Sequence, residues 1–244
     1  MSAPCILRTA IGRFRPRTAL EKIDELALMS LPYSVEVFFA SMAQYNHFWF
    51  PGTILAVLLL LVAFALVARP NSSRIVGALL AVSWVWVGAA HQLQHMATLN
   101  FMAPIYGIAW IVEGVLIAFT CTVLGRLRFR FGGDFRGWTG LGLAVFGLFG
   151  YPLVALLLGI SWRALPLAGM APDPTVIFTA GILVATRERP PLHLFVIPLG
   201  WAGVAAMSAY LLNFPLDYAV SVAVLAAAVL AIRMRMRSTI GSPT

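Results

Sequence analysis

Long apolar stretches recur along this chain, and short segments that carry arginine separate them. About 20 apolar residues cross the hydrocarbon core of a bilayer once as a helix. On that measure the sequence predicts an all-α, polytopic membrane bundle of about seven transmembrane helices, near residues 49–67, 75–95, 103–124, 138–158, 175–186, 194–212 and 216–232. The fifth stretch is short: at 1.5 Å rise it spans roughly 20 Å, against a core of about 30 Å.

Composition excludes a water-soluble domain. Hydrophobic residues make up 61% of the chain and charged residues only 11%, whereas charged residues are about a quarter of a typical soluble domain. The net charge of +8 does not indicate nucleic-acid binding, because the basic residues sit in short clusters between apolar stretches. We therefore expect the lipid bilayer, and not nucleic acid, to be the chain's surroundings.

The loop charges predict an orientation. Arginines follow the first, third, fifth and seventh stretches, whereas only Arg163 follows the second, fourth and sixth. The positive-inside rule then favours seven crossings in a bacterial inner membrane, with the N-terminus outside and the C-terminus cytoplasmic. The cytoplasmic arginines are Arg69, Arg74, Arg126, Arg128, Arg130, Arg136, Arg187, Arg189, Arg233, Arg235 and Arg237.

Four regions follow from this pattern. Residues 1–28 are a polar, basic N-terminal extension that conflicts with the outside assignment, so we interpret Met29, rather than Met1, as the biological start. Residues 29–48 carry an apolar and aromatic face at helical spacing and are predicted to lie at the membrane interface. Residues 49–232 form the transmembrane domain, and residues 233–244 are a basic cytoplasmic tail.

The second and third stretches carry the first candidate site. His91 and His95 lie one helical turn apart, and Glu113 is the only acidic residue well inside an apolar span. Two histidines and a carboxylate could bind a ligand or a metal ion, and the histidines could ligate haem or relay protons. The structural alternative is that the histidines are interfacial hydrogen-bonding residues and that Glu113 is a neutral acid bonded between helices.

The start of the fifth stretch carries the second candidate site. Asp173 or Thr175 is a suitable N-cap in the run Pro-Asp-Pro-Thr, and Thr179 lies one turn further on. A helix this short would begin below the outer surface, where its positive dipole end could hold an anion. Simple capping is the structural alternative.

Several function classes are excluded or unsupported. The spans contain no lysine for a retinal Schiff base, and no Walker A loop, GxSxG or HExxH motif is present. Cys5 and Cys121 have no metal-binding spacing. We expect no enzymatic activity, and the cofactor, if there is one, stays open among haem, metal, pigment and quinone.

Scattered motifs resemble an uncharacterised family of bacterial multi-pass inner-membrane proteins, sometimes labelled permeases. The resemblance covers residues 31–230 and implies the fold and the membrane location, but not a mechanism. The motifs that carry it are Phe38-Phe39, Tyr45-Asn46, Pro51, Trp84-x-Trp86 with His91, Arg128-Phe-Arg-Phe131, Tyr151-Pro152, Pro174-Thr175-x-x-Phe178-Thr179-x-Gly181, Arg189-Pro-Pro-Leu192, Ile197-Pro198 and Trp201.

Two functions remain in view. The first is a small permease or solute-binding protein with an outward-facing polar pocket around Glu113, His91 and His95, together with Asp173. The second is a non-catalytic accessory subunit of a respiratory or photosynthetic complex, which packs against other membrane subunits, pigment or quinone. Either could also form a homo-oligomer.

Overall fold

The computed structural model describes the backbone of residues 33–240 and the side chains of residues 33–236. The predicted extension 1–28 and the choice between Met1 and Met29 lie outside the described residues. The predicted all-α class is confirmed, since the described part of the chain contains helices and two isolated bridges but no named strand. The helical segments are α2 (Val35–Phe48), α3 (Gly52–Val67), α4 (Ser73–Trp86), η1 (Val87–His95), η2 (Met96–Thr98), α5 (Ala103–Ile117), η3 (Ala118–Val123), α6 (Phe135–Val145), η4 (Phe146–Gly150), α7 (Tyr151–Leu157), η5 (Trp162–Ala164), α8 (Pro172–Val184), η6 (Leu192–Phe195), α9 (Val196–Leu211), η7 (Pro215–Asp217) and α10 (Tyr218–Ile240).

Five continuous helices among the described residues are long and apolar enough to span a bilayer. They are Ser73–Thr98, Ala103–Val123, Phe135–Leu157, Leu192–Leu211 and Pro215–Met236. The bent pair of α2 and α3 makes a sixth candidate when taken together, and α8, with 13 residues, is a shorter apolar helix. The predicted count of seven crossings therefore stays a prediction.

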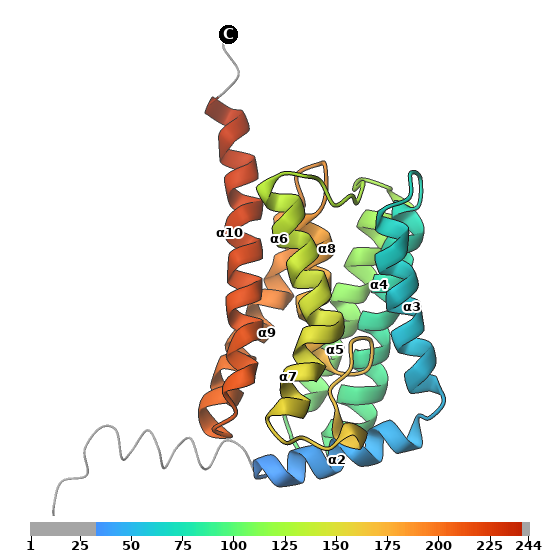
Figure 1. Ribbon diagram of the computed structural model, residues 1–244, viewed down its shortest axis with the longest axis vertical. Helices are drawn as coiled ribbons and strands as arrows, with labels where there is room; N and C mark the ends of the chain where they lie inside the picture. The colour runs from blue at the N-terminus through green and yellow to red at the C-terminus, as the bar shows by residue number, and fades with distance from the viewer. Residues whose placement is uncertain (1–32, 241–244) are drawn as a thin grey trace, which may run out of the picture. The chain divides into compact units, whose positions relative to one another are not determined.

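The chain turns sharply between α2 and α3, by 88°. Ser34 caps the start of α2 by accepting a hydrogen bond from the Val37 amide. Pro51 lies between the two helices, and because its nitrogen carries no hydrogen it cannot continue the hydrogen-bond pattern of α2. As a result α2 lies across one end of the bundle while α3 runs along it (Figure 1).

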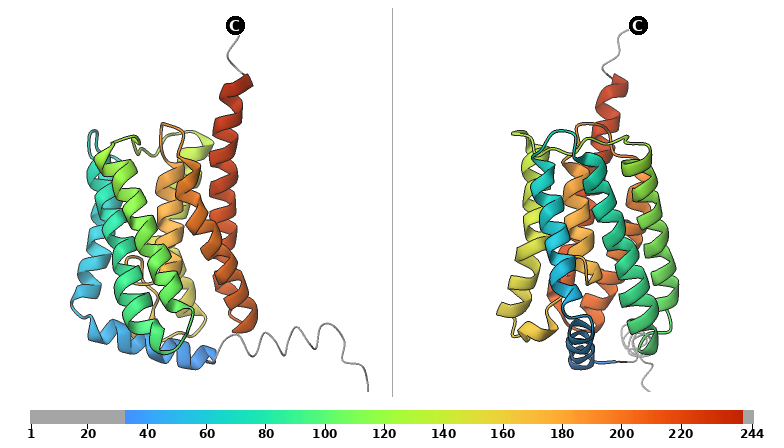
Figure 2. Two further views of the ribbon diagram at one scale, coloured as in Figure 1. Left: turned by 180° about the vertical axis from the view of Figure 1, so that it is seen from behind. Right: turned by 90° about the vertical axis from the view of Figure 1, so that its right-hand side faces the viewer.

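Helix α8 lies inside the bundle and packs against α4, α6, α9 and α10. All of its residues except Asp173 are buried. It packs so closely on α6 that a Cβ atom added at Gly181 would lie 2.6 Å from the Gly140 carbonyl oxygen. The two further views show α9 and α10 side by side next to this core (Figure 2).

The segment before α8 enters the bundle without helical structure. Gly169 adopts a φ of +84°, and a Cβ atom there would lie 3.2 Å from the carbonyl oxygen of Ala56 in α3. Asn46 in α2 holds the beginning of the segment, since its Nδ2 donates hydrogen bonds of 3.0 Å to the carbonyls of Arg163 and Leu165. Helix α8 therefore begins inside the bundle, and its start below the outer membrane surface stays a prediction.

The arginine-bearing loops gather at the end of the bundle opposite α2. The α3–α4, η3–α6 and α8–η6 connections lie there together with the C-terminal part of α10 (Figure 1). Hydrogen bonds join the loops: the Arg187 amide donates to the Arg128 carbonyl over 3.0 Å, and the Phe129 amide donates to Ser73 Oγ over 3.0 Å. The sequence pattern predicted that the arginine-bearing loops share one side, and in the structure these loops lie at the same end of the bundle.

Candidate functional site

A small cavity with both polar and apolar lining residues lies near the end of the bundle where α2 crosses it. Its volume is about 60 Å³, which is room for a few water molecules or a small ion. Its polar lining includes His91, Gln92, Asp173, Trp201 and Asp217. A smaller void of about 10 Å³ adjoins it and shares His91, Asp173 and Asp217, so these three residues form the centre of the site.

Two carboxylates and one tyrosine form the most polar cluster of this site. Tyr151 Oη lies 2.6 Å from Asp217 Oδ1 and 3.3 Å from Asp173 Oδ2. Tyr151 is fully buried as the first residue of α7, Asp173 lies in the first turn of α8, and Asp217 ends η7. Three separate elements thus converge on one hydroxyl group.

The count of hydrogen atoms limits how this cluster can be satisfied. A tyrosine hydroxyl has one hydrogen to donate, and an ionised carboxylate can only accept. The hydroxyl can therefore satisfy one carboxylate at a time. The second carboxylate would be neutralised either by a bound cation or by a proton on one of the two carboxyl groups.

Trp201 fixes the second oxygen of Asp173. Its Nε1 atom donates a hydrogen bond of 2.8 Å to Asp173 Oδ1 from helix α9. The Trp201 ring is itself held edge-on against Tyr106 and Trp110, with ring centroids 5.7 Å and 5.4 Å away. An aromatic wall therefore sets the position of the carboxylate beside the cavity.

His91 faces the cavity, whereas His95 does not line it. His91 is buried, and its Nε2 atom lies 3.2 Å from Met42 Sδ. Its Nδ1 atom is buried without a hydrogen-bond partner. Nε2 of His95 instead contacts Ser41, 2.7 Å from the hydroxyl oxygen and 3.0 Å from the carbonyl oxygen, and ties η1 to α2.

The metal site predicted at His91 and His95 gains no support from the geometry. The two ring centroids are 6.5 Å apart, and the intervening segment is wound as a π-helix rather than an α-helix. Within residues 33–240, no group of three or more His, Cys, Asp or Glu side chains is arranged to hold a metal ion. His95 makes hydrogen bonds within the protein, as the structural alternative expected, and its place at a membrane interface stays a prediction.

Glu113 does not join the histidines. It is completely buried in α5, and neither of its carboxylate oxygens has a hydrogen-bond partner. It lines neither of the two cavities that His91 lines. The carboxylates that line these cavities together with His91 belong to Asp173 and Asp217. These two residues, and not Glu113, are the acidic residues that share the cavities with His91.

The two predicted threonine ligands make bonds within the protein. Thr175 Oγ1 accepts a hydrogen bond from the Gly169 amide and donates one to the Ala171 carbonyl, which closes the turn before α8. Thr179 Oγ1 accepts a hydrogen bond from Trp84 Nε1 over 2.9 Å. Of the residues predicted at the start of this helix, the structure brings only Asp173 to the cavity.

Sequence reasoning did not select Tyr151, Trp201 or Asp217 as site residues. Asp217 was recognisable only as a polar residue on the face now closed by α2, and Tyr151 only as the neighbour of a proline. Their hydrogen-bonded contact spans 66 positions of the chain, and no local pattern signals it. The Asp-Pro pair at residues 173–174 was the one usable signal.

Comparison with known proteins places the chain in a family but gives it no activity. A family model described as a family of unknown function (DUF6064) matches residues 35–242, which is most of the chain. No curated protein and no solved structure matches it. The match runs from the first residue of α2 to beyond the described end of α10, and so includes His91, Tyr151, Asp173, Trp201 and Asp217 around the cavity, which is called the acidic cavity below. The chain is a member of this family of unknown function.

Proposed function

We propose that this protein is a small, non-enzymatic permease of the bacterial inner membrane that binds a small monovalent cation between Asp173 and Asp217. The observation that carries the proposal is the pair of carboxylates that share the Tyr151 hydroxyl inside an apolar bundle. Ionisable residues at membrane depth are costly and are usually found on ion or proton pathways. The cavity of about 60 Å³ limits the cation to one of alkali-metal or methylammonium size.

The charge of the cavity favours a cation over the anion expected from the helix dipole. The positive end of α8 does point to this place, but Asp173 already occupies its first turn. Asp217 adds a second carboxylate, and no Lys or Arg lines the cavity among the described residues. A bound anion would face two carboxylates, whereas a cation would offset their repulsion.

The interrupted path of the chain at α8 suits a transporter. Non-helical backbone at membrane depth is tolerated where it is buried in protein or lines a cavity, and transporters place binding sites at such half-helices. Residues 165–171 together with α8 would make the fifth of seven crossings. With the arginine loops cytoplasmic, the N-terminus and the acidic cavity would lie on the outer side.

Ligand-dependent thermal stability of the full-length purified protein tests the binding step. Methylammonium, sodium or potassium chloride should raise the Tm relative to N-methylglucamine chloride at equal ionic strength, because a ligand that binds only the folded state stabilises it. Asp173→Asn and Asp217→Asn should abolish the increase. Asp134→Asn is the matched control, since it removes a carboxylate outside the cavity and should keep the increase.

Transport is then measured in liposomes. Vesicles containing the wild-type protein should accumulate labelled methylammonium or sodium faster than vesicles containing Asp173→Asn. Equal melting temperatures in all chloride salts, or an equal cation response in the wild type and both cavity variants, would refute the cation site. Binding without uptake would leave a solute-binding protein and refute the permease.

A further inference from the structure

The end of the bundle opposite the acidic cavity carries a second, larger hollow. Its volume is about 700 Å³, and residues of the arginine-bearing loops line it. No Asp or Glu is among its described lining residues. The arginines that line it are Arg69, Arg74, Arg128, Arg130 and Arg187.

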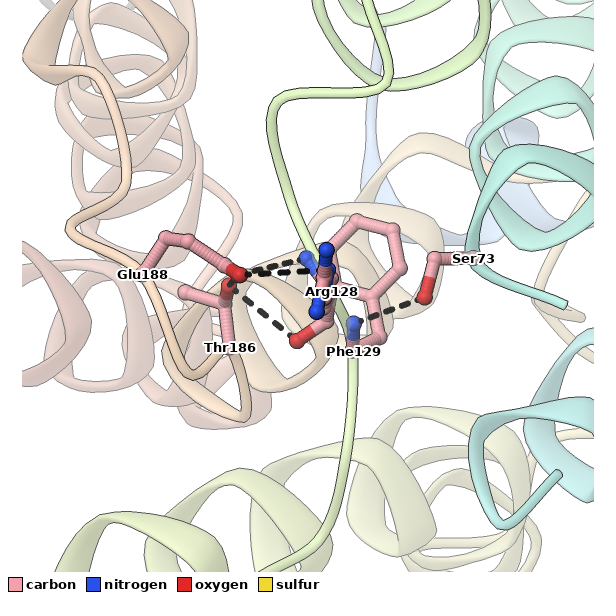
Figure 3. A network of polar contacts seen from close by, with 5 residues as sticks. All are labelled: Ser73, Arg128, Phe129, Thr186 and Glu188. Atoms are coloured by element: carbon pink, nitrogen blue, oxygen red, sulfur yellow. Dashed lines mark hydrogen bonds and ion pairs between the residues drawn. The ribbon is translucent and has the colours of Figure 1, made fainter. Parts of the chain in front are cut away.

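Hydrogen bonds between three loops hold this hollow open. Phe129 at the centre donates its amide hydrogen to Ser73 Oγ over 3.0 Å, and Thr186 lies on its other side (Figure 3). The Arg130 amide donates to the Ala185 carbonyl over 2.6 Å. The arginines therefore project from a braced frame, which lowers the entropy cost of gathering them around a ligand.

Arg74 is positioned by a glycine. Gly125 adopts a φ of +59°, and a Cβ atom added there would lie 2.8 Å from Arg74 Nε. The exposed guanidinium group therefore lies close to the backbone of the η3–α6 loop. A planar guanidinium held in this way can bind a phosphate through two parallel hydrogen bonds.

The nearby acids leave most of this positive charge uncompensated. Glu188 is hydrogen-bonded to the loops themselves. Its Oε2 atom accepts hydrogen bonds from the Arg128 amide and from Thr186 Oγ1 (Figure 3). Its Oε1 atom is 3.8 Å from Arg128 Nε. Asp134 pairs with Arg136, and both line an adjoining hollow that shares Arg130 and Arg187 with the larger one.

Apolar helix surface continues directly from the hollow. Ile75, the residue after Arg74, is 54% exposed, and Val123 and Leu124, just before Gly125, are 63% and 39% exposed. Helix α4 packs against η3, so these side chains lie on neighbouring elements. A ligand with a phosphate group and hydrocarbon chains would meet both surfaces at once.

We propose that this hollow binds the headgroup phosphate of an anionic phospholipid, with the acyl chains along the α4–η3 surface. Basic pockets between membrane helices on the cytoplasmic side suit such headgroups. The proposal requires the bundle to lie in a bilayer, but it is independent of the cation site at the other end. A free phosphate compound would satisfy the arginines and leave the apolar surface unused.

The experiment uses native mass spectrometry of the full-length protein in neutral detergent with added phosphatidylglycerol or phosphatidylcholine. We expect one tightly bound phosphatidylglycerol per chain and no comparable retention of phosphatidylcholine. Arg74→Gln combined with Arg130→Gln should weaken phosphatidylglycerol binding roughly thirtyfold, which corresponds to two basic residues near an anionic lipid. The matched control is Arg163→Gln combined with Arg233→Gln, which removes the same charge outside the hollow and should bind as the wild type does.

Three results would overturn the proposal. Equal retention of the two lipids by the wild type would exclude a headgroup site. Equal losses in the two double variants would show a diffuse charge effect. Full displacement of phosphatidylglycerol from the wild type by inorganic phosphate or glycerol phosphate, but not by soluble dihexanoyl-phosphatidylglycerol, would assign the hollow to a free phosphate compound, and this competition does not depend on the folding of any variant.

Discussion

Trp84 Nε1 donates a hydrogen bond of 2.9 Å to Thr179 Oγ1, and this buried bond joins α4 to α8. Both residues are almost completely buried, so water cannot replace either partner. The Trp84 ring also stacks on Trp110, with centroids 4.1 Å apart, which fixes the direction of its N–H group. The threonine predicted as a ligand thus acts as an acceptor that holds two helices in register.

Thr179→Val should destabilise the protein while keeping its volume. The indole N–H would lose its acceptor, and an unpaired buried donor costs about 1–3 kcal/mol. Thr179→Ser keeps the hydroxyl group, so its stability should be closer to that of the wild type. Thermal unfolding in detergent measures both variants, and a valine variant as stable as the serine variant would contradict the structural role of the bond.

Gly181→Ala should strongly destabilise the fold, because it adds a methyl group where α6 and α8 are in close contact. The new Cβ would lie 2.6 Å from the Gly140 carbonyl oxygen, so α6 and α8 would have to move apart. Gly142→Ala is the control on α6, because nothing lies within 4 Å of its added Cβ. We expect a large loss of folded protein in size-exclusion chromatography for the first variant and none for the second. Equal yields would show that the two helices do not pack this closely.

Glu113→Leu should leave stability unchanged or raise it. Both carboxylate oxygens are buried without partners, and replacing an unsatisfied polar group by an apolar one of similar shape removes a desolvation penalty. The cation response proposed for the cavity should also persist, since Glu113 does not line it. A clear decrease in Tm, or a lost cation response, would reveal a functional partner for Glu113.

Asp134→Ala should cost about 1 kcal/mol at pH 7, because Asp134 Oδ1 caps α6 by accepting the Gly137 amide hydrogen. The hydrogen bond from Arg136 and this cap lower the pKa of Asp134. A lowered pKa in the folded state gives stability that is present above the unfolded value near 4 and is lost as the pH falls through the folded value. The Tm difference between the wild type and the alanine variant should therefore shrink below about pH 4. A difference that stays constant down to pH 2 would contradict this account.

The sequence alone predicted that the fold is all-helical and that the arginine-bearing loops lie together on one side. Apolar length and loop charge are local properties, and they carry over directly into the helices and into the end where the loops gather. Asp173 was also recoverable, because proline and aspartate together mark a helix start.

The partners within the site could not be read in the same way. The helical rise predicts how deep His91 and Glu113 lie along their helices, but depth does not determine the direction in which each side chain points. That direction depends on how α4 and α5 are rotated against each other, and close contacts set it: a Cβ at Gly88 would lie 2.7 Å from the Gly107 carbonyl oxygen. With this packing, His91 lines the cavity and Glu113 does not.

The burial of α8 depends on helices that come after it in the chain. Helices α9 and α10 follow α8 in the chain, and both pack against it in the finished fold. The side chains of α8 therefore reach their final burial only once the last of these helices has packed against it. A chain that ended before Tyr218 would leave the side of α8 that α10 covers without its partner.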